Sequence, residues 1–265
     1  MDLSGLKVLV TGGGGSGVGK GVSNVLDAHG ATVIINEVSW EKAEKAANQL
    51  NSAIPIQADI SDKAQVIAMF DTIKKEVGVI NGLVNNAGIG LSKELHKIKE
   101  AEYDKVFGVN VKGMWLVTSS FVDQLLPSGQ KGSIVNVSSV HSQASQPKYS
   151  TYASTKAAVE GFTRATAYEL GKHGIRCNAI APGLVHSDQN RELISTWAED
   201  PEKWLEDFIK YQQVLEQNIE PEDCGQAAAF FLSDMSRSIT GQTLFVDAGK
   251  SIMLFNRDYV DQSAL

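Results

Sequence analysis

Cysteine, proline and long apolar runs are all scarce in this sequence. Its 265 residues include two cysteines, Cys177 and Cys224, which lie in apolar surroundings and lack the spacing of metal ligands. We therefore expect buried free thiols, and neither a disulfide framework nor a metal site. The six prolines form no linker, and no apolar run approaches the roughly 18 residues of a membrane span.

Positive charge is in deficit as well. The chain has 24 lysines and arginines against 31 aspartates and glutamates, which gives a formal net charge of −7. Such a chain lacks the electrostatic footprint of a protein that binds nucleic acid or an anionic membrane, so we expect neither partner. Residues 1–7 lack the pattern of a signal peptide. With so few cysteines, we expect a reducing, cytoplasmic location.

Short apolar runs alternate with helical patterns along the chain. The runs are rich in β-branched residues, as expected of strands covered on both faces. They lie at residues 7–11, 31–36, 54–57, 79–84, 134–138 and 174–181. The alternation predicts the α/β class, with a single doubly wound domain over residues 1–265 and a parallel sheet of about seven strands.

A glycine cluster, residues 11–19 (TGGGGSGVG), follows the first of these runs. Between a strand and a helix, such a cluster lets backbone N–H groups approach a pyrophosphate; a flexible loop is the simpler alternative. Glu37 ends the second run, twenty residues after Gly17, the spacing at which a carboxylate reaches the ribose hydroxyls of a dinucleotide. A carboxylate there would repel a 2′-phosphate, and no lysine or arginine lies near the strand end. The sequence therefore predicts NAD rather than NADP, with a solvated loop acid as the alternative for Glu37.

A serine, a tyrosine and a lysine in the second half of the chain suggest proton transfer. Ser139 follows a buried run, and Tyr152 and Lys156 are four residues apart in the helical pattern after it. Side chains at that spacing share one helix face. The ammonium group is therefore expected to lower the pKa of the phenol from about 10, which makes Tyr152 a general acid or base. Ser139 can donate a hydrogen bond to the substrate oxygen.

A second pair, Tyr168 and Lys172, repeats the same spacing. Sixteen residues at about 100° each place Tyr168 roughly 160° around the helix from Tyr152, so the two pairs face opposite sides. Thirteen residues before Tyr168 stands Thr155, which lies inside the helix rather than at a strand end. We therefore assign Tyr168 and Lys172 to the scaffold or surface.

The spacing of Ser139, Tyr152 and Lys156 resembles the catalytic core of the short-chain dehydrogenase/reductase family. Residues 85–88 (Asn-Asn-Ala-Gly) and 182–187 are similar to the segments that lie beside the nicotinamide in that family, and residues 238–249 look like its last strand. The likeness covers about residues 5–249. It implies a Rossmann fold, an NAD(P) cofactor, and a homotetramer with interfaces on the helices within 100–126 and 150–173.

The resemblance implies a role for each residue that matches a family motif. The catalytic set is Asn110, Ser139, Tyr152 and Lys156. Asn110 would hold a water beside the lysine, or alternatively pack its amide at a helix interface. Asp59 would approach the adenine, or alternatively cap the next helix, as Ser61 also could. The cofactor set is Gly12, Ser16, Gly17, Val18, Gly19, Glu37, Asp59, Ile60, Asn86, Ala87, Gly88, Tyr152, Lys156, Pro182, Gly183, Val185 and Ser187.

Three features depart from the family pattern. Gly17 and Gly19 come one position late, as though one glycine were inserted, which leaves the contacts of residues 12–15 open. Ser16 stands where NADP-using members often carry a basic residue. Ser187 replaces a threonine and keeps the hydroxyl.

Residues 188–218 are implied to form a lid over the substrate. Asp200-Pro201 is typical of a helix start, and it precedes an apolar stripe of Trp204, Phe208, Tyr211 and Leu215. The alternative is that this stripe only packs on the domain. The candidates for contact with a hydroxylated substrate are Ser139, His141, Gln143, Tyr152 and His186. The side chains that would instead wall an apolar pocket are Trp197, Trp204 and Phe208. The tail, residues 250–265, either docks on a neighbouring subunit or frays.

These residues predict an NAD-dependent oxidoreductase that transfers hydride reversibly between a secondary alcohol and its ketone. A polyol, a sugar or an alicyclic alcohol is the favoured substrate class. One alternative is an NADP-dependent 3-oxoacyl or other ketone reductase. Another, from a different class, is a catalytically silent nucleotide-binding sensor or scaffold, which would have no need of the complete catalytic set.

Overall fold

A parallel sheet forms the centre of the fold, which a computed structural model describes over residues 1–256. Its strands lie in the order β3-β2-β1-β4-β5-β6-β7, and every neighbouring pair is parallel. Because the order turns back at β1, which pairs with both β2 and β4, the domain is doubly wound. The predicted fold class is confirmed. The strands are β1 (Lys7–Thr11), β2 (Thr32–Glu37), β3 (Ala53–Gln57), β4 (Gly82–Asn85), β5 (Gly132–Val137), β6 (Ile175–Pro182) and β7 (Thr243–Val246).

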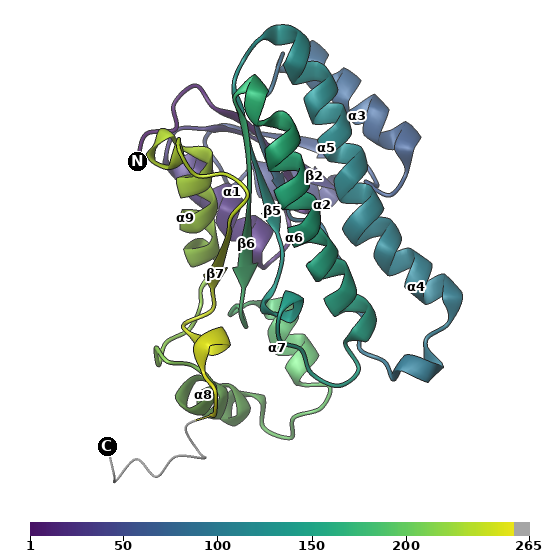
Figure 1. Ribbon diagram of the computed structural model, residues 1–265, viewed down its shortest axis with the longest axis vertical. Coiled ribbons are helices and arrows are strands. Elements are labelled where there is room, and N and C mark those ends of the chain that lie inside the picture. The colour runs from purple at the N-terminus through teal and green to yellow at the C-terminus, as the bar shows by residue number, and fades with distance from the viewer. Residues whose placement is uncertain (257–265) are drawn as a thin grey trace.

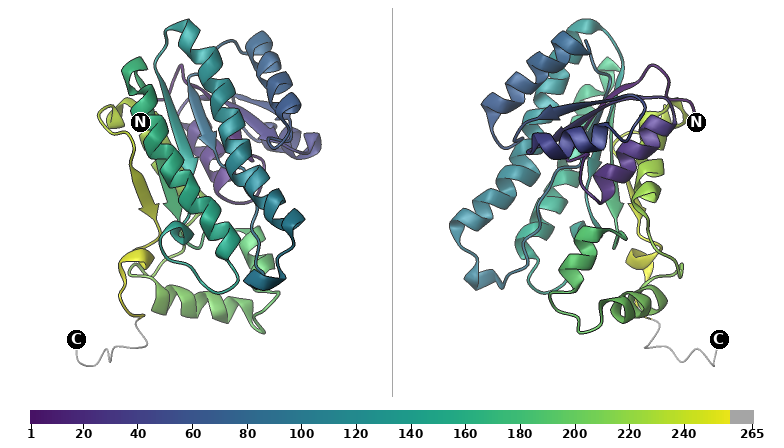
Figure 2. Two further views of the ribbon diagram at one scale, coloured as in Figure 1. Left: turned by 45° about the vertical axis from the view of Figure 1, so that its right-hand side comes forward. Right: turned by 180° about the vertical axis from the view of Figure 1, so that it is seen from behind.

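Helices cover both faces of the sheet (Figure 1). One face carries α1 (Val18–Ala28), α2 (Trp40–Ala47) and α9 (Pro221–Leu232). The other carries α3 (Lys63–Glu76), α5 (Met114–Leu125) and α6 (Ser150–Leu170). α4 (Glu100–Phe107) runs into α5 through the turn Gly108–Gly113. α7 (Asp188–Ile194) and α8 (Pro201–Gln212) lie past the carboxyl ends of the strands (Figure 2). Short 3₁₀ turns occupy Leu95–Lys97, Leu126–Ser128, Val140–Ser142, Gly171–His173, Asp234–Ser236 and Lys250–Ile252.

An apolar core lies on each face of the sheet. Side chains alternate along a strand, so Val8 and Val10 pack toward α1 and α9, whereas Leu9 between them packs toward α3 and α5. Cys177 and Cys224 are buried free thiols in opposite cores, as predicted. Burial raises the pKa of each to about 12. No helix in the described part of the chain is long and apolar enough to cross a membrane.

Helix starts follow capping signals, with one correction. Asp200 caps α8 ahead of Pro201, as predicted. α3, however, is capped by Asp62, whose carboxylate accepts hydrogen bonds from the Ala64 and Gln65 amides at 2.8 and 3.3 Å. The prediction that Ser61 or Asp59 caps this helix is therefore wrong.

Three predicted boundaries also differ from the structure. β4 begins at Gly82 rather than at residue 79, and the Asn81 side chain before it accepts a hydrogen bond from the Lys7 amide at 2.9 Å. β7 is confined to residues 243–246, because the chain turns before it through Gly241, whose φ is +73°. α8 ends at Gln212, so Leu215 does not extend its stripe.

Candidate active site

Tyr152 and Lys156 lie on one face of α6, next to the loop that follows β5. The Lys156 Nζ lies 5.6 Å from the centre of the Tyr152 ring and donates a hydrogen bond to the Val137 carbonyl at 2.8 Å. Ser139, in extended backbone just after β5, shares a hydrogen bond with the Tyr152 side chain. The structure therefore brings together the three residues that the sequence spacing selected.

Burial is the largest influence on the pKa values of Lys156 and Tyr152. Lys156 is 5% exposed, and loss of hydration lowers its pKa to about 8. The Tyr152 pKa is raised, because burial disfavours the phenolate more than the hydrogen bond with Ser139 favours it. The expectation that Lys156 brings the tyrosine pKa below its ordinary value is thus contradicted in this structure. The physical reason is that the lysine ammonium bonds to the Val137 carbonyl while desolvation acts on the phenol.

The second Tyr-Lys pair takes no part in this site. Tyr168 is 92% exposed, and Lys172 is exposed in the 3₁₀ turn after α6. Their assignment to the scaffold or surface is confirmed.

Asn110 lies in a π-helical turn, Gly108–Gly113, between α4 and α5. Its side chain accepts a hydrogen bond from the Ile89 amide at 2.8 Å and donates to the Ile89 carbonyl and the Thr155 hydroxyl, both at 3.0 Å. Thr155 in turn donates to the Tyr152 carbonyl at 2.7 Å, which ties Asn110 to the catalytic helix. π-helical turns recur at functional sites. The packed amide is what the structure shows, and the water-holding role stays a prediction.

Glu160 is a buried carboxyl group on α6 that contacts residues on either side of Ser139. It was not among the residues predicted from the sequence. It is 8% exposed and receives hydrogen bonds from the Ser142 and Ser138 hydroxyls at 2.5 and 3.3 Å. These bonds join the loop that carries Ser139 to the helix that carries Tyr152. The signal was present in the sequence, since Glu160 lies eight residues after Tyr152 on the same helix face.

Two aromatic rings surround the phenol of Tyr152. The His141 ring stacks on Tyr149 with centroids 4.9 Å apart and meets Tyr152 edge-on at 5.5 Å. The Nδ1 atom of His141 is 3.0 Å from the Ser145 hydroxyl, and burial lowers the pKa of His141, which favours a neutral ring. His141 thus lies beside the phenol of Tyr152, and its contact with a substrate stays a prediction, whereas Gln143 is exposed. Sequence reasoning assigned no role to Tyr149, because no periodicity marks the loop before α6.

His186 lies in the loop after β6, in a cavity that Tyr152 does not line. Its ring pairs with Glu220, with Nδ1 and Oε1 3.2 Å apart. The cavity, of about 320 Å³, also has Ser16, Lys20 and Arg191 in its wall and adjoins the glycine loop. The predicted substrate set is therefore not brought together completely, and a substrate contact of His186 stays a prediction.

The glycine loop between β1 and α1 is tightly packed at its base and open at its rim. A side chain at Gly19 would collide with the Gly12 carbonyl. The side-chain amide of Asn86 donates hydrogen bonds to the Thr11 and Gly12 carbonyls at 3.0 and 2.9 Å. At Gly17, by contrast, the nearest neighbour of a Cβ would be the Ser187 hydroxyl at 3.9 Å. This cradle fits a dinucleotide whose pyrophosphate meets the N-terminus of α1, which begins at Val18.

The loop after β6 meets the glycine loop at the same edge of the sheet. Ser187 caps α7 and accepts a hydrogen bond from the Asn190 amide at 3.3 Å. The Val185 carbonyl accepts a hydrogen bond from the Asn190 side chain at 2.7 Å. Pro182 ends β6, and Gly183 packs against Asp247. The predicted contacts of this turn with a nicotinamide carboxamide stay predictions.

The remaining predicted cofactor residues lie at the ends of β2, β3 and β4. Asp59 accepts hydrogen bonds from the Ser61 amide and hydroxyl at 2.8 and 2.7 Å, which makes a local turn, and its approach to an adenine stays a prediction. The Ile60 side chain is buried against Gly113. Ala87 packs on Gly12. A Cβ on Gly88 would lie 3.6 Å from the Lys156 Nζ, so this backbone borders the catalytic lysine.

α7 and α8 cover this end of the sheet (Figure 2). The Trp204 ring contacts two others. Its centroid lies 6.1 Å from that of Trp197 and 5.3 Å from that of Phe208. Lys250, at the start of the tail, donates a hydrogen bond to the Gln212 side chain at 2.7 Å. The first tail residues therefore lie against α8 of their own chain. The rest of the predicted tail, residues 257–265, is outside the described residues, and the lid over a substrate stays a prediction.

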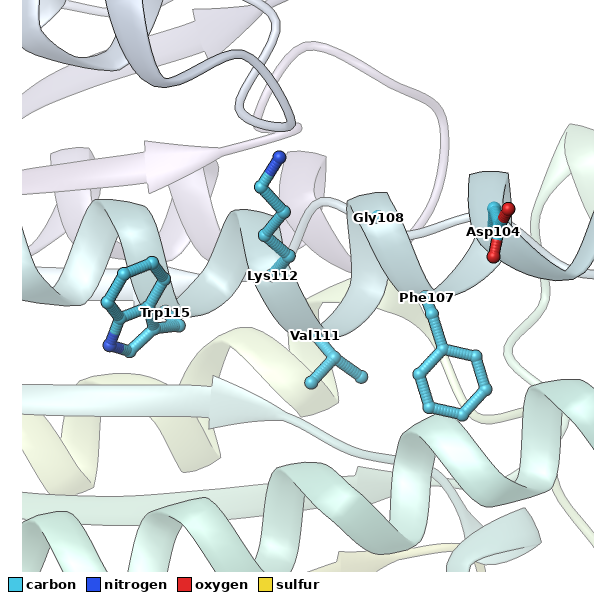
Figure 3. A pocket seen from close by; sticks show the side chains of 6 residues that line it. All are labelled: Asp104, Phe107, Gly108, Val111, Lys112 and Trp115. Atoms are coloured by element: carbon cyan, nitrogen blue, oxygen red, sulfur yellow. The ribbon is translucent and has the colours of Figure 1, made fainter. Parts of the chain in front are cut away.

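A hollow of about 440 Å³ on α4 and α5 contains none of the predicted site residues (Figure 3). Its lining is Asp104, Phe107, Gly108, Val111, Lys112 and Trp115. Neither a catalytic residue nor a glycine-loop residue contributes to it, so we do not assign the chemistry to this hollow.

Comparisons with known proteins agree with this geometry. A family model described as enoyl-(acyl carrier protein) reductase matches residues 13–251. The 3-oxoacyl-[acyl-carrier-protein] reductase FabG of Thermotoga maritima is 35% identical over 253 residues, which cover 94% of this chain and 99% of the relative. The (2S)-[(R)-hydroxy(phenyl)methyl]succinyl-CoA dehydrogenase subunit BbsD of Thauera aromatica is 34% identical over 95% of this chain and 99% of its own.

Solved structures match over a similar length. Levodione reductase superimposes with a TM-score of 0.88 and 32% identity, covering 94% of this chain and 98% of that chain. A gluconate 5-dehydrogenase from Burkholderia cenocepacia, in complex with NADP and tartrate, gives a TM-score of 0.86 and 31% identity, covering 96% and 98%. The protein is thus an oxidoreductase that works with a nicotinamide cofactor. It belongs to the short-chain dehydrogenase/reductase family, as the spacing of Ser139, Tyr152 and Lys156 indicated.

Proposed function

We propose that the protein is an NAD-dependent enzyme that transfers hydride reversibly between a secondary alcohol and its ketone. The observation that carries the proposal is the arrangement of Ser139 and Lys156 around the phenol of Tyr152, at the same sheet edge as the glycine loop. When bound, the nicotinamide donates the hydride to the ketone or accepts it from the alcohol.

Tyr152 is the acid and base of this reaction. Its raised pKa keeps the phenol protonated at neutral pH, so it holds a proton for the ketone oxygen in the direction of reduction. In the direction of oxidation, the phenol first releases its proton to solvent, and the phenolate then takes the hydroxyl proton of the alcohol. The Ser139 hydroxyl orients the substrate oxygen. Lys156, with a pKa of about 8, is mainly positively charged at pH 7 and favours the phenolate as it forms.

Lys156 would also bind the nicotinamide ribose, and its position beside the backbone at Gly88 supports this role. Asn110 supports the path by which protons reach the site, through its bonds to Ile89 and Thr155. A catalytically silent sensor or scaffold is the disfavoured alternative, because binding alone does not require this set.

The choice of NAD is supported by Glu37 at the end of β2. In the described part of the chain, no lysine or arginine pairs with its carboxylate. One carboxylate oxygen accepts a hydrogen bond from the Gly14 amide; the other can accept from the ribose hydroxyls, and the negative charge would repel a 2′-phosphate. Lys20 and Arg191 lie near Ser16, but they share that cavity with Glu220 and other acids.

An NADP-dependent 3-oxoacyl or other ketone reductase is the second candidate. The 35% identity with FabG favours it, as does the NADP bound in the gluconate 5-dehydrogenase neighbour. The charge of Glu37 argues against it, and a direct comparison of cofactors separates the two.

The favoured substrate is a polyol, a sugar or an alicyclic alcohol. The neutral His141 ring beside Tyr152 offers a polar contact for a hydroxylated molecule, and the name of the gluconate 5-dehydrogenase neighbour points to the same class. A cytoplasmic location completes the proposal, supported by the two free thiols.

Initial rates test this function. Secondary alcohols of the three favoured classes are assayed with NAD⁺ and NADP⁺, and ketones, including a 3-oxoacyl thioester, with NADH and NADPH. We expect oxidation of at least one alcohol, with kcat/KM about tenfold or more higher for NAD⁺, the effect of one charge contact of about 1.4 kcal/mol. A preference for NADPH with the 3-oxoacyl thioester would contradict the proposal.

A further inference from the structure

The glycine loop is hydrogen-bonded to the last two residues of β2. The Gly12 and Gly13 amides both donate hydrogen bonds to the Asn36 carbonyl, at 2.8 and 3.3 Å. The next amide, of Gly14, donates to the Oε1 atom of Glu37 at 2.9 Å. The loop that is one residue longer than the family pattern is therefore joined to the side chain that we assign to the adenosine ribose.

Gly14 is packed where a side chain has no room. A Cβ on Gly14 would lie 2.9 Å from the Lys42 carbonyl oxygen, in the first turn of α2, and 3.0 Å from the Cγ atom of Glu37. Its φ is outside the left-handed region, so space alone excludes a side chain there. Gly15, the next residue, also has an ordinary φ and has no atom within 4 Å of its Cβ position. Gly15 is thus a matched control.

Within the described part of the chain, the Gly14 amide is the one hydrogen-bond donor to the Glu37 carboxylate. Among the described residues 1–256, Glu37 receives a side-chain hydrogen bond from Gly14 and forms no ion pair. A backbone N–H bound to a carboxylate is a strong hydrogen bond. It occupies one oxygen and leaves the other to accept from a ribose hydroxyl. A carboxylate held in place before binding loses less freedom when the ligand arrives.

We propose that Gly14 is a positioning residue for cofactor choice. Its N–H and its lack of a side chain hold the Glu37 carboxylate toward the adenosine ribose, and this raises the preference for NAD(H) over NADP(H). The inference rests on the proposed NAD dependence, and it gives the extra glycine of the loop a role.

Binding of NADH and of NADPH to the full-length protein, followed by nicotinamide fluorescence, tests the role of Gly14 without any substrate. Gly14→Ala is expected to weaken NADH about tenfold and leave NADPH no weaker, so that the preference for NADH falls about tenfold. Gly15→Ala lies in the same loop but does not contact Glu37, so the ratio of its NADH and NADPH dissociation constants is expected to stay within about twofold of the wild-type ratio. In a Glu37→Ala background, Gly14→Ala should not change the ratio further.

Two results would overturn the role of Gly14. One is an unchanged NADH to NADPH ratio in Gly14→Ala. The other is an equal loss for both cofactors, which would place the effect on the shared pyrophosphate. A wild-type protein that binds NADPH more tightly would instead overturn the proposed NAD dependence, while the change in ratio would still decide the role of Gly14. Should Gly14→Ala fail to fold, Glu37→Asp keeps the charge but draws it away from Gly14. It should also weaken NADH about tenfold, and an unchanged affinity contradicts the proposal.

Discussion

Lys156 is an ammonium group held where water hardly reaches it. Its pKa is about 8 in the folded protein, against an ordinary value of 10.5. In the unfolded chain the lysine regains the ordinary value, so between about pH 8 and pH 10.5 the unfolded state binds more protons than the folded state. The contribution of this residue to stability therefore rises with pH across that window. Below pH 8 the buried charge therefore lowers the stability of the folded protein.

We predict that Lys156→Met removes this pH dependence. The free energy of unfolding of the wild-type protein, relative to Lys156→Met, should rise by about 2 kcal/mol between pH 8 and pH 10. Urea unfolding at the two pH values measures it. Methionine fills similar space without charge, and the other groups that titrate there, including the buried cysteines, are common to both proteins. The same pH dependence in both would show that Lys156 is not buried as described.

The sequence predicted which residues meet in the site, but it did not predict their pKa values. The spacing of Tyr152 and Lys156 sets a shared helix face, so their meeting followed from periodicity alone. The raised pKa of Tyr152 did not, because desolvation depends on everything that packs around the ring. The stacking of Tyr149 on His141 was equally hidden, since an irregular loop brings the two rings together.

α4, the π-helical turn and α5 form one continuous helical stretch with an apolar outer side. Phe107, Val111 and Trp115 follow each other at intervals of four residues and project from the same side, while Lys112 points the opposite way (Figure 3). Trp115 is 51% exposed. We propose that this side and α6 are the interfaces of a homotetramer, as the family resemblance implied.

Trp115→Glu is predicted to break the assembly, because it places a charge in an apolar interface. Sedimentation velocity should give the mass of four chains for the wild-type protein and a smaller mass for Trp115→Glu. Leu95→Glu is the control: Leu95 is 73% exposed and lies outside both helical interfaces, so its mass should not change. A wild-type monomer, or a tetrameric Trp115→Glu, would refute the interface.

Elements were predictable where local signals decide them. The alternation of apolar runs and helical patterns gave the strands, and Asp200-Pro201 gave the start of α8. The start of β4 was misplaced because Asn81 bonds to Lys7 on β1. That contact joins residues far apart in sequence, and no local pattern reports it.

At the scale of the whole molecule, the parallel sheet assembles the site. Parallel strands present their carboxyl ends at one edge, so the loops after β1, β2, β4, β5 and β6 converge there. Glu37, Asn86, Ser139 and Ser187 are far apart along the chain and reach this edge on different loops. The substrate could not be predicted in the same way, because α7 and α8 belong to no repeating strand–helix unit and their packing is specific to this chain.

We propose that the Tyr152 hydroxyl moves the proton, while the affinity for the cofactor depends mainly on other groups. Turnover of Tyr152→Phe, in a preparation whose NADH affinity is measured alongside, tests it most directly, because the substitution removes the hydroxyl alone. We predict that kcat falls by about 10²–10⁴-fold or more while NADH binds nearly as in the wild-type protein. Substantial turnover by Tyr152→Phe with NADH still bound would contradict the account.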